Sequence, residues 1–378
     1  ANVLDISSDM VDAYRPQLVL HGTEIWVFWD QYRKPNYSVQ GCKLFPSTGE
    51  TVQVSPDGQY CLTPAVLSHR SGLYVAWLRK MDVIGGPGVI SQWHTLHAAK
   101  RRDDLWVSVM DANGKSEGAE LTQGLMAKIS PQIVATGGYL GSRVRPMLRS
   151  CGDSVWMLWE RKSDHRGSTP RVSGDLVGRP IDGRTWQMPV RLHHGYVDYH
   201  VLHSAGNDDQ GFSVVASRLP SEGRRTYELF DVETAGADPL QQETWTGWNP
   251  IDLPIKSETP LRRKVESGGK TYKLFWGDLH CHSNLSADAE GEVDELNHYA
   301  RDRAGLDVVV FTNNDFLYDV PLTEHEYAYG NYFANVYSQP GSFLALPGYE
   351  WTSRVPRLRT ASVSDPRNWT PPYQNGSY

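Results

Sequence analysis

Two histidines separated by one residue, His280 and His282, are the residues of this sequence best suited to hold a metal ion. They stand in residues 274–283, L-F-W-G-D-L-H-C-H-S, which begin as an apolar, aromatic strand. Side chains alternate between the faces of a strand, so positions i and i+2 point the same way, about 6.5–7 Å apart. We therefore expect both imidazoles on one face, with Asp278, and neutral imidazole is the commonest side-chain metal ligand.

Two more carboxylates follow in positions that suit the same site. Asp288 lies in a turn-like segment, S-A-D-A, and offers a hard oxygen ligand. Glu350 follows a short apolar strand and could bridge two metal ions. In parallel α/β barrels the active site gathers at the C-terminal ends of successive strands. A His-x-His pair is a weak signal by itself, and its alternative interpretation is a pair of ordinary loop residues.

Composition limits the remaining possibilities. The 378 residues suffice for about two domains, and 37 basic against 44 acidic residues make the chain mildly acidic. No block of Lys and Arg marks a nucleic-acid face, and no apolar run reaches the ~18–20 residues of a membrane span. We therefore expect neither a nucleic-acid nor a membrane partner. The four cysteines follow no zinc or disulfide spacing, and the sequence indicates no compartment.

Residues 1–250 contain a repeated pair of β-rich runs, the first of each pair opening near a proline. Pro16 and Pro64 are separated by about 48 residues, as are Trp29 and Trp77, which matches the length of a propeller blade. This pattern predicts a β-propeller-like domain of about five blades, with a β-sandwich as the alternative. The paired runs are 15–20 with 25–29, 63–67 with 73–77, 145–148 with 155–159, and 200–202 with 212–215, and a divergent unit is expected near 130–134.

A glycosidase function of this domain is a third possibility. The run D-G-R-T-W at 182–186 resembles the turn motif of sialidase-like blades. The candidate residues would be Arg15, Arg145, Glu160 and Arg161. Nothing in their spacing selects them, and an arginine before proline at the start of a repeat is interpreted as structural. A binding or scaffolding role for the domain is therefore preferred.

We expect a linker at 251–269, an α/β module at 270–352 and a coil tail at 353–378, because the linker and the tail combine Pro, Gly or charge without apolar periodicity. The expected helix buries Leu296, Tyr299 and Ala300 and stops at Gly305. Acids at its start favour the positive helix N-terminus. The expected elements of the module are a strand at 272–276, a helix at 293–304, and strands at 306–311 and 343–346.

The motifs of this module, G-D-L-H-C-H-S, S-A-D, G-L-D-V-V-V-F-T and P-G-Y-E-W-T, resemble the polymerase and histidinol phosphatase (PHP) superfamily, in the branch with a β-rich N-terminal region. The resemblance covers about residues 275–352, the first third of such a module. It implies a distorted seven-stranded barrel with two or three Zn, Mn or Fe ions. His280 and His282 would hold one ion, Asp288 would help with another, and Glu350 would bridge. Metal-bound water would attack a phosphate ester.

Two departures from the PHP pattern weaken this expectation. Asn313 and Asn314 stand where Asp-His is usual, and an amide oxygen is a weaker ligand than imidazole; Asp315 or His325 could substitute. The later ligand-bearing strands have no counterpart, so an incomplete or weakly active member is expected. The predicted function is a PHP-type phosphoesterase with Asp278 and Glu350 as catalytic carboxylates, acting on a small phosphorylated or glycan-like substrate. The alternative is a silent PHP remnant beside a propeller that binds glycan or protein.

Overall fold

The computed structural model describes most of the chain, with gaps. The described residues are 11–85, 100–110, 127–128, 145–163, 173–182, 185–202, 210–218, 226–240, 248–250, 264–286, 289, 291–314, 316–317 and 320–351. None of the helices among them is long and apolar enough to cross a membrane.

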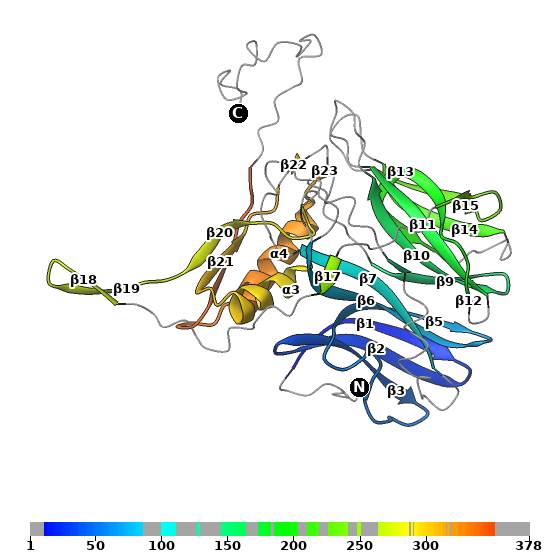
Figure 1. The fold of residues 1–378 in the computed structure, drawn as a ribbon, viewed down its shortest axis with the longest axis horizontal. Coiled ribbons are helices and arrows are strands. Elements are labelled where there is room, and N and C mark those ends of the chain that lie inside the picture. The colour runs from blue at the N-terminus through cyan, green and yellow to red at the C-terminus, as the bar shows by residue number, and fades with distance from the viewer. Residues whose placement is uncertain are drawn as a thin grey trace, which may run out of the picture.

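The first 250 residues fold into antiparallel sheets whose strands follow one another in chain order (Figure 1). Glycines with positive φ, such as Gly22 (φ 59) and Gly152 (φ 55), form the tight turns between the paired strands. The first sheet contains β1 (Asp12–His21), β2 (Glu24–Arg33), β3 (Asn36–Phe45) and β4 (Val52–Gln53). The second contains β5 (Tyr60–His69), β6 (Gly72–Gly85), β7 (Lys100–Met110) and β8 (Ala127–Lys128).

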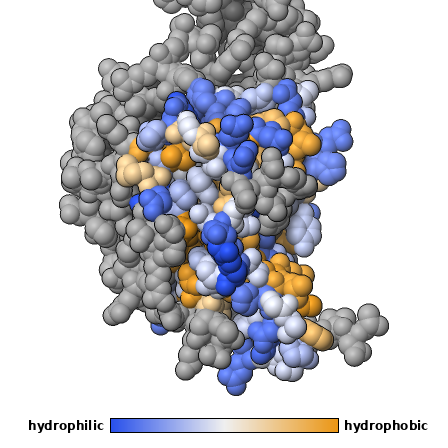
Figure 2. Space-filling view, turned by 90° about the vertical axis from the view of Figure 1, so that its right-hand side faces the viewer, coloured by the Kyte–Doolittle hydropathy of each residue, from blue (hydrophilic) through white to orange (hydrophobic). Residues whose placement is uncertain are grey.

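The third and fourth groups of strands are joined into one sheet, because β11 also pairs with β13. The third group is β9 (Met147–Cys151), β10 (Ser154–Ser163), β11 (Ser173–Asp182) and β12 (Thr185–Trp186). The fourth is β13 (Val190–Val201), β14 (Gly211–Arg218), β15 (Thr226–Glu233) and β16 (Asp238–Pro239). Figure 2 views the molecule from the side of β14 and β15 and shows hydrophobic residues in separate groups among hydrophilic ones.

Large apolar side chains fill the space between these sheets. Trp77 and Phe28 are fully buried in one cluster, and Met157 and Val177 in the next. The four predicted strand pairs overlap described strands, two of them with runs that extend one or two residues beyond the strand, and the prediction of a mostly β protein is confirmed. The divergent unit expected near 130–134 lies outside the described residues. β17 (Trp248–Pro250) returns to pair with β6, so the β-rich sheets extend to the edge of the expected linker.

The C-terminal module is an open parallel sheet covered by helices on one face. Its strands are β20 (Gly277–Cys281), β21 (Val308–Phe311) and β24 (Leu344–Pro347), in that spatial order. Its helices are α3 (Val293–His298), the π-helical turn η1 (Tyr299–Arg303) and α4 (Glu324–Tyr337). The face without helices exposes Leu279, Leu344 and Leu346. The prediction of a barrel is wrong for the described residues, because three parallel strands leave both edges of the sheet open.

Two predicted boundaries in this module also differ from the structure. The first strand was expected at 272–276, but β19 (Lys270–Lys273) pairs back with β18 (Lys264–Ser267) in an exposed hairpin. The parallel strand therefore starts later, at Gly277, and His280 lies inside it. Part of the expected linker at 251–269 is thus a strand. The short pair β22 (Phe316–Leu317) and β23 (Val320–Pro321) lies between β21 and α4.

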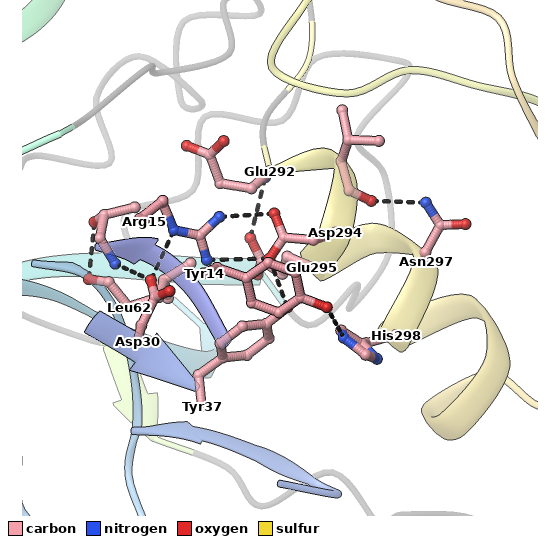
Figure 3. Close-up of polar contacts among 12 residues, drawn as sticks. Tyr14, Arg15, Asp30, Tyr37, Leu62, Glu292, Asp294, Glu295, Asn297 and His298 are labelled. Atoms are coloured by element: carbon pink, nitrogen blue, oxygen red, sulfur yellow. Dashed lines mark hydrogen bonds and ion pairs between the residues drawn. The ribbon is translucent and has the colours of Figure 1, made fainter. Parts of the chain in front are cut away.

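Helix α3, with its continuation η1, buries two faces, of which apolar spacing predicted one. Leu296 and Ala300 pack in the core of the module as expected, whereas the second buried face is polar and was not expected. Tyr299 is 38% exposed, whereas Asp294, Glu295 and Asn297 are each 0% exposed. The reason is that α3 packs against the β-rich sheets, where Arg15 bonds to Asp294 of the helix (Figure 3). The sequence analysis explained the acids by the helix dipole alone and did not foresee partners from strands far away in the chain.

Arg15 of β1 makes the central contact of this interface. Its Nε donates to Asp30 Oδ2 at 2.7 Å, and its two terminal nitrogens donate to the Asp294 carboxylate at 2.7 and 3.0 Å. Arg15 has φ 50, a conformation rare outside glycine, at a register shift between Tyr14 and Gln17. Such a bulge re-aims a side chain, here toward the helix.

Two further ion pairs flank the Arg15 contact, one on each side along the acids of α3. Lys80 Nζ lies 2.7 Å from Glu295 Oε2, and the Arg145 guanidinium donates to both oxygens of Glu292 at 3.0 and 2.8 Å. Beyond them, the His298 ring stacks on Tyr32 with the ring centroids 3.7 Å apart. The helix is therefore fixed to three sheets of the β-rich part.

Asp294→Asn should lower the free energy of unfolding by about 3–5 kcal/mol, because it leaves the buried Arg15 guanidinium without its bidentate partner. Urea denaturation followed by tryptophan fluorescence measures this. The matched control is Asp153→Asn, which removes an exposed pair with Arg70 and should change the value by less than about 1 kcal/mol. Equal effects of the two substitutions would show that the buried contact does not hold the modules together.

Candidate functional site

A cavity of about 480 Å³ lies where the β-rich sheets meet the loop after β20 and the start of α4. This volume falls in the range of small-molecule sites, about 300–1,000 Å³. Its walls combine charged, amide, hydroxyl and aromatic side chains with a few apolar ones. They are Arg15, Gln17, Thr63, Pro64, Ala65, Val66, Arg145, Pro146, Met147, Arg149, Glu160, Tyr199, His200, Tyr227, Asn284, Leu285 and Glu326.

The repeated Xaa-Pro elements of the sequence meet at this cavity. Arg15, Thr63 and Arg145 each stand directly before a proline, and all three line the cavity. Thr63 has φ 54 at its own register shift, as Arg15 does, and its backbone N–H donates to Asp30 Oδ2 at 2.5 Å. Equivalent positions of three strand groups thus face one space, although the sequence analysis treated these positions as structural only.

The acids beside the cavity are paired with its first two arginines. Burial raises the pKa of Asp30 to about 7, against the opposing charge of Arg15. Burial also pushes the pKa of Glu292 upward, but Arg145 and Arg15 outweigh it and hold that pKa at about 2. The Glu292 carboxylate is therefore ionised at neutral pH and neutralises Arg145.

The third arginine of the cavity has a different set of partners. Arg149 Nε donates to the Val201 carbonyl and Nη1 to the Leu148 carbonyl, each at 2.7 Å. Burial lowers the pKa of Arg149, and among the described residues its hydrogen-bond partners are carbonyl oxygens, with no carboxylate to counteract that effect. Arg149 is thus held by neutral carbonyl oxygens at the wall of the cavity.

Glu160 and two tyrosines also line the cavity. Glu160 Oε2 accepts from the Tyr199 backbone N–H at 3.4 Å, and the Tyr199 hydroxyl donates to the Gly174 carbonyl at 3.2 Å. Tyr227 is 53% exposed and offers an open ring face. Of the four residues nominated for a glycosidase, three line the cavity, and Arg161 is not among its lining residues.

The two histidines of the sequence motif converge on Glu350 at the C-terminal end of the parallel sheet. His280 Nε2 lies 3.3 Å and His282 Nε2 3.0 Å from the same oxygen of Glu350. One ligand atom of each residue falls within 4.8 Å of the others. We call these three residues the His–His–Glu cluster. Two imidazole nitrogens and one carboxylate oxygen are a donor set that suits a divalent transition metal and leaves a coordination position open.

Asn313 and Asn314, which follow β21, support this cluster. The Glu350 backbone N–H donates to the Asn313 carbonyl at 3.0 Å, which ties the end of β24 to the end of β21. Asn314 Nδ2 lies 3.2 Å from His282 Nδ1 and 3.0 Å from Ser286 Oγ. Turning the amide over would let its oxygen accept from Nδ1–H, so that the Nε2 lone pair faces the cluster. Asn314 therefore orients the imidazole.

The remaining candidates from the sequence do not join the His–His–Glu cluster. Asp278 is exposed and its Oδ1 accepts from the His280 backbone N–H at 3.0 Å. His325 lies exposed in the first turn of α4. Asp288 and Asp315 lie outside the described residues.

Sequence reasoning missed Arg149, Tyr199 and the buried acids of α3. Arg149 shares a strand face with Met147, which alternation from the Arg145-Pro146 element could have indicated. Nothing in the sequence pattern indicated Tyr199. It lies in β13, which is separated from the Glu160 strand β10 by β11 in the sheet, so its place at the cavity depends on the order of the strands. The pairing of Glu292, Asp294 and Glu295 with cations more than a hundred residues away carries no local signal.

Comparison with known proteins assigns no family to the chain. No family model matches it, and no curated protein matches it. The similar solved structures include an endo-arabinanase from Bacillus licheniformis, with 9% identity over 58% of this chain and 73% of that one, at a TM-score of 0.31. A thermostable family-43 glycoside hydrolase has 10% identity over 64% and 79%, at 0.33. A Trypanosoma rangeli sialidase has 12% identity over 62% and 37%, at 0.35. Scores this low assign neither a family nor an activity.

These findings correct the predicted family. The resemblance to the PHP superfamily is wrong, because no family model matches the motifs that suggested it and the described C-terminal sheet is not the barrel that it implied. The phosphoesterase function drawn from that resemblance is wrong as well, and the assignment of zinc or manganese that came with it has no support from the comparisons. The described part of the module agrees, since it is an open sheet.

Lowering the pH from about 5 toward 2 should lower the free energy of unfolding, because the folded pKa of Glu292 lies below its ordinary value of 4.5. The stabilisation is full above pH 4.5 and disappears as the carboxylate is protonated. In Glu292→Gln the protein should be less stable at pH 7 and should lose less on acidification. Urea titrations from pH 7 to pH 3 measure both slopes, with the exposed Glu266→Gln as control. Parallel curves for wild type and Glu292→Gln would contradict this role.

Proposed function

We propose that this chain is a carbohydrate-binding protein and that its ligand occupies the cavity between the β-rich sheets and the C-terminal module. The observation that carries the proposal is the composition of the wall. A sugar presents many hydroxyls and a weakly apolar ring face, so its site needs several donors and acceptors and an aromatic surface. Arginine, asparagine and glutamine donors, the Glu160 carboxylate and the rings of Tyr199 and Tyr227 supply both.

The arrangement of the sheets supports the same location. We propose that the successive four-stranded groups are blades of an open, propeller-like domain. Blades of such a domain radiate from a central channel, and equivalent positions of each blade face it. The convergence of Arg15, Thr63 and Arg145 on one cavity is what this arrangement predicts.

A small ligand suits this site better than a protein partner does. Stable protein interfaces bury about 800 Å² on each side over a broad surface. The cavity is a concave site of about 480 Å³, close to the size expected for one or two sugar rings. The sequence left open whether the β-rich domain binds glycan or protein, and we therefore prefer glycan binding.

Tyr227→Ala should weaken binding of the best ligand from a glycan array by about 3- to 10-fold, because it removes a stacking surface worth about 0.5–1.5 kcal/mol. Calorimetry with the corresponding methyl glycoside measures the change. Tyr272→Ala is the matched control, since Tyr272 is 52% exposed in the β18–β19 hairpin, away from the cavity. Absence of any glycan binding by the folded wild-type chain would reject the proposed function.

We also propose that the His–His–Glu cluster binds one divalent metal ion. The support is the meeting of three suitable donor atoms from β20, the loop after it and the end of β24. His280, His282 and Glu350 would hold the ion, and the ion would supply a Lewis-acidic position. Asn284, two residues after His282, lines the sugar cavity, so the loop that carries one metal ligand also carries part of the cavity wall.

His282→Ala should abolish the binding of one equivalent of Co²⁺, measured by visible absorption and by elemental analysis after gel filtration. The loss should exceed about 100-fold in affinity, because even partners in the outer shell contribute 10- to 100-fold. Asn314→Ala should therefore cost about 10- to 100-fold. His325→Ala is the control and should bind Co²⁺ like the wild type. Retention of full affinity in His282→Ala would reject the site.

A further inference from the structure

We propose that the sugar bound in the cavity carries a carboxylate, as a uronic or other sugar acid does, and that Arg149 is the residue that recognises it. This inference rests on the carbohydrate-binding function proposed above and adds the chemical class of the ligand. It comes from the way in which the charges around the cavity are paired.

Two of the three arginines in the wall are already neutralised by the protein. Arg15 lies between the buried carboxylates of Asp30 and Asp294, and Arg145 is bonded to both oxygens of Glu292. A ligand carboxylate would have to displace these partners to use either guanidinium. Both residues therefore shape the cavity without offering it an unused positive charge.

Arg149 differs because its bonds are to carbonyl oxygens only. Its Nε and Nη1 are held by Val201 and Leu148 at 2.7 Å, which fixes the plane of the guanidinium. Among the described residues Nη2 has no hydrogen-bond partner, and Arg149 forms part of the cavity wall. A guanidinium removed from water without a counter-charge is costly, so an anion that enters beside it gains a charge-assisted hydrogen bond.

The position of Arg149 leaves room for the rest of a sugar. Arg149 is directly opposite Trp156 in the β9–β10 pair, and Glu160 lies four residues further along β10, on the same face. At a rise of about 3.3 Å per residue the two positions are roughly 13 Å apart. A carboxylate can therefore bind at Arg149 while hydroxyls at the far end of the sugar donate to Glu160, and the two like charges stay apart.

The test compares sugars that differ only in the carboxylate. Calorimetry with methyl glucuronide against methyl glucoside, and methyl galacturonide against methyl galactoside, should show at least about tenfold tighter binding of the acids, the smaller end of what a hydrogen bond to a charged group contributes. Arg149→Gln should remove this preference, so that the acidic and the neutral sugar of each pair bind with affinities within about twofold of each other. Arg149→Lys, which keeps the charge, should retain part of the preference.

The matched control is Arg179→Gln. Arg179 is also a buried arginine whose Nε donates to a carbonyl, that of Gln187, but it does not line the cavity. It should keep the full preference for the acids. Equal binding of acidic and neutral sugars by the wild type overturns this inference and leaves the carbohydrate-binding function standing. A preference that survives in Arg149→Gln overturns the assignment to Arg149. Binding of none of the sugars overturns both proposals.

Discussion

The ion pair of Arg15 with Asp30 and Asp294 is the contact on which the arrangement of the whole molecule depends. Both carboxylates are fully buried, and the guanidinium that joins them belongs to the first strand of the chain. Removing such charges from water costs several kcal/mol for each ion, so the arrangement is stable only when all partners are in place. Tyr37 adds a hydrogen bond to Asp294 Oδ2 at 2.7 Å. Helix α3 can therefore dock on the β-rich sheets in one orientation only.

The docking of α3 on the β-rich sheets also forms the cavity, because residues that fix the helix are part of the cavity wall. The residues that fix the helix, Arg15 and Arg145, stand at the starts of two strand groups and also line the cavity. Asp294 and Glu292 neutralise these two arginines, whereas Arg149 of the same wall bonds only to carbonyl oxygens among the described residues. The specificity that we propose is thus a consequence of the way in which the modules are joined.

Periodicity and turn signals predicted most of the local structure. Alternating β-branched and aromatic residues and glycine turns indicated the strand pairs of the first 250 residues, and the parallel strands near 306–311 and 343–346 were located within two residues. Spacing by two residues placed His280 and His282 on one side, and the structure puts both beside Glu350. These signals are local in the chain or follow from strand geometry.

Predictions that depended on distant contacts or on resemblance were less successful. The helix at 293–304 was found, and Leu296 and Ala300 of its apolar face pack in the core of the module. Apolar spacing did not indicate the second buried face, on which Asp294 and Glu295 pair with Arg15 and Lys80. The barrel and the phosphoesterase function came from motif resemblance and are corrected. Xaa-Pro positions were interpreted as structural, whereas their strained backbone at Arg15 and Thr63 directs them toward one cavity. Such convergence is a property of the folded sheets and has no counterpart in the spacing of the residues.

The proposed binding of a sugar acid in the cavity beside Arg149 can be observed in a crystal of the chain soaked with methyl glucuronide, because electron density locates the ligand independently of its affinity. We expect the sugar ring between Tyr227 and the Xaa-Pro elements, with its carboxylate within hydrogen-bonding distance of the Arg149 guanidinium. An empty cavity, or a sugar whose carboxylate points away from Arg149, would contradict it.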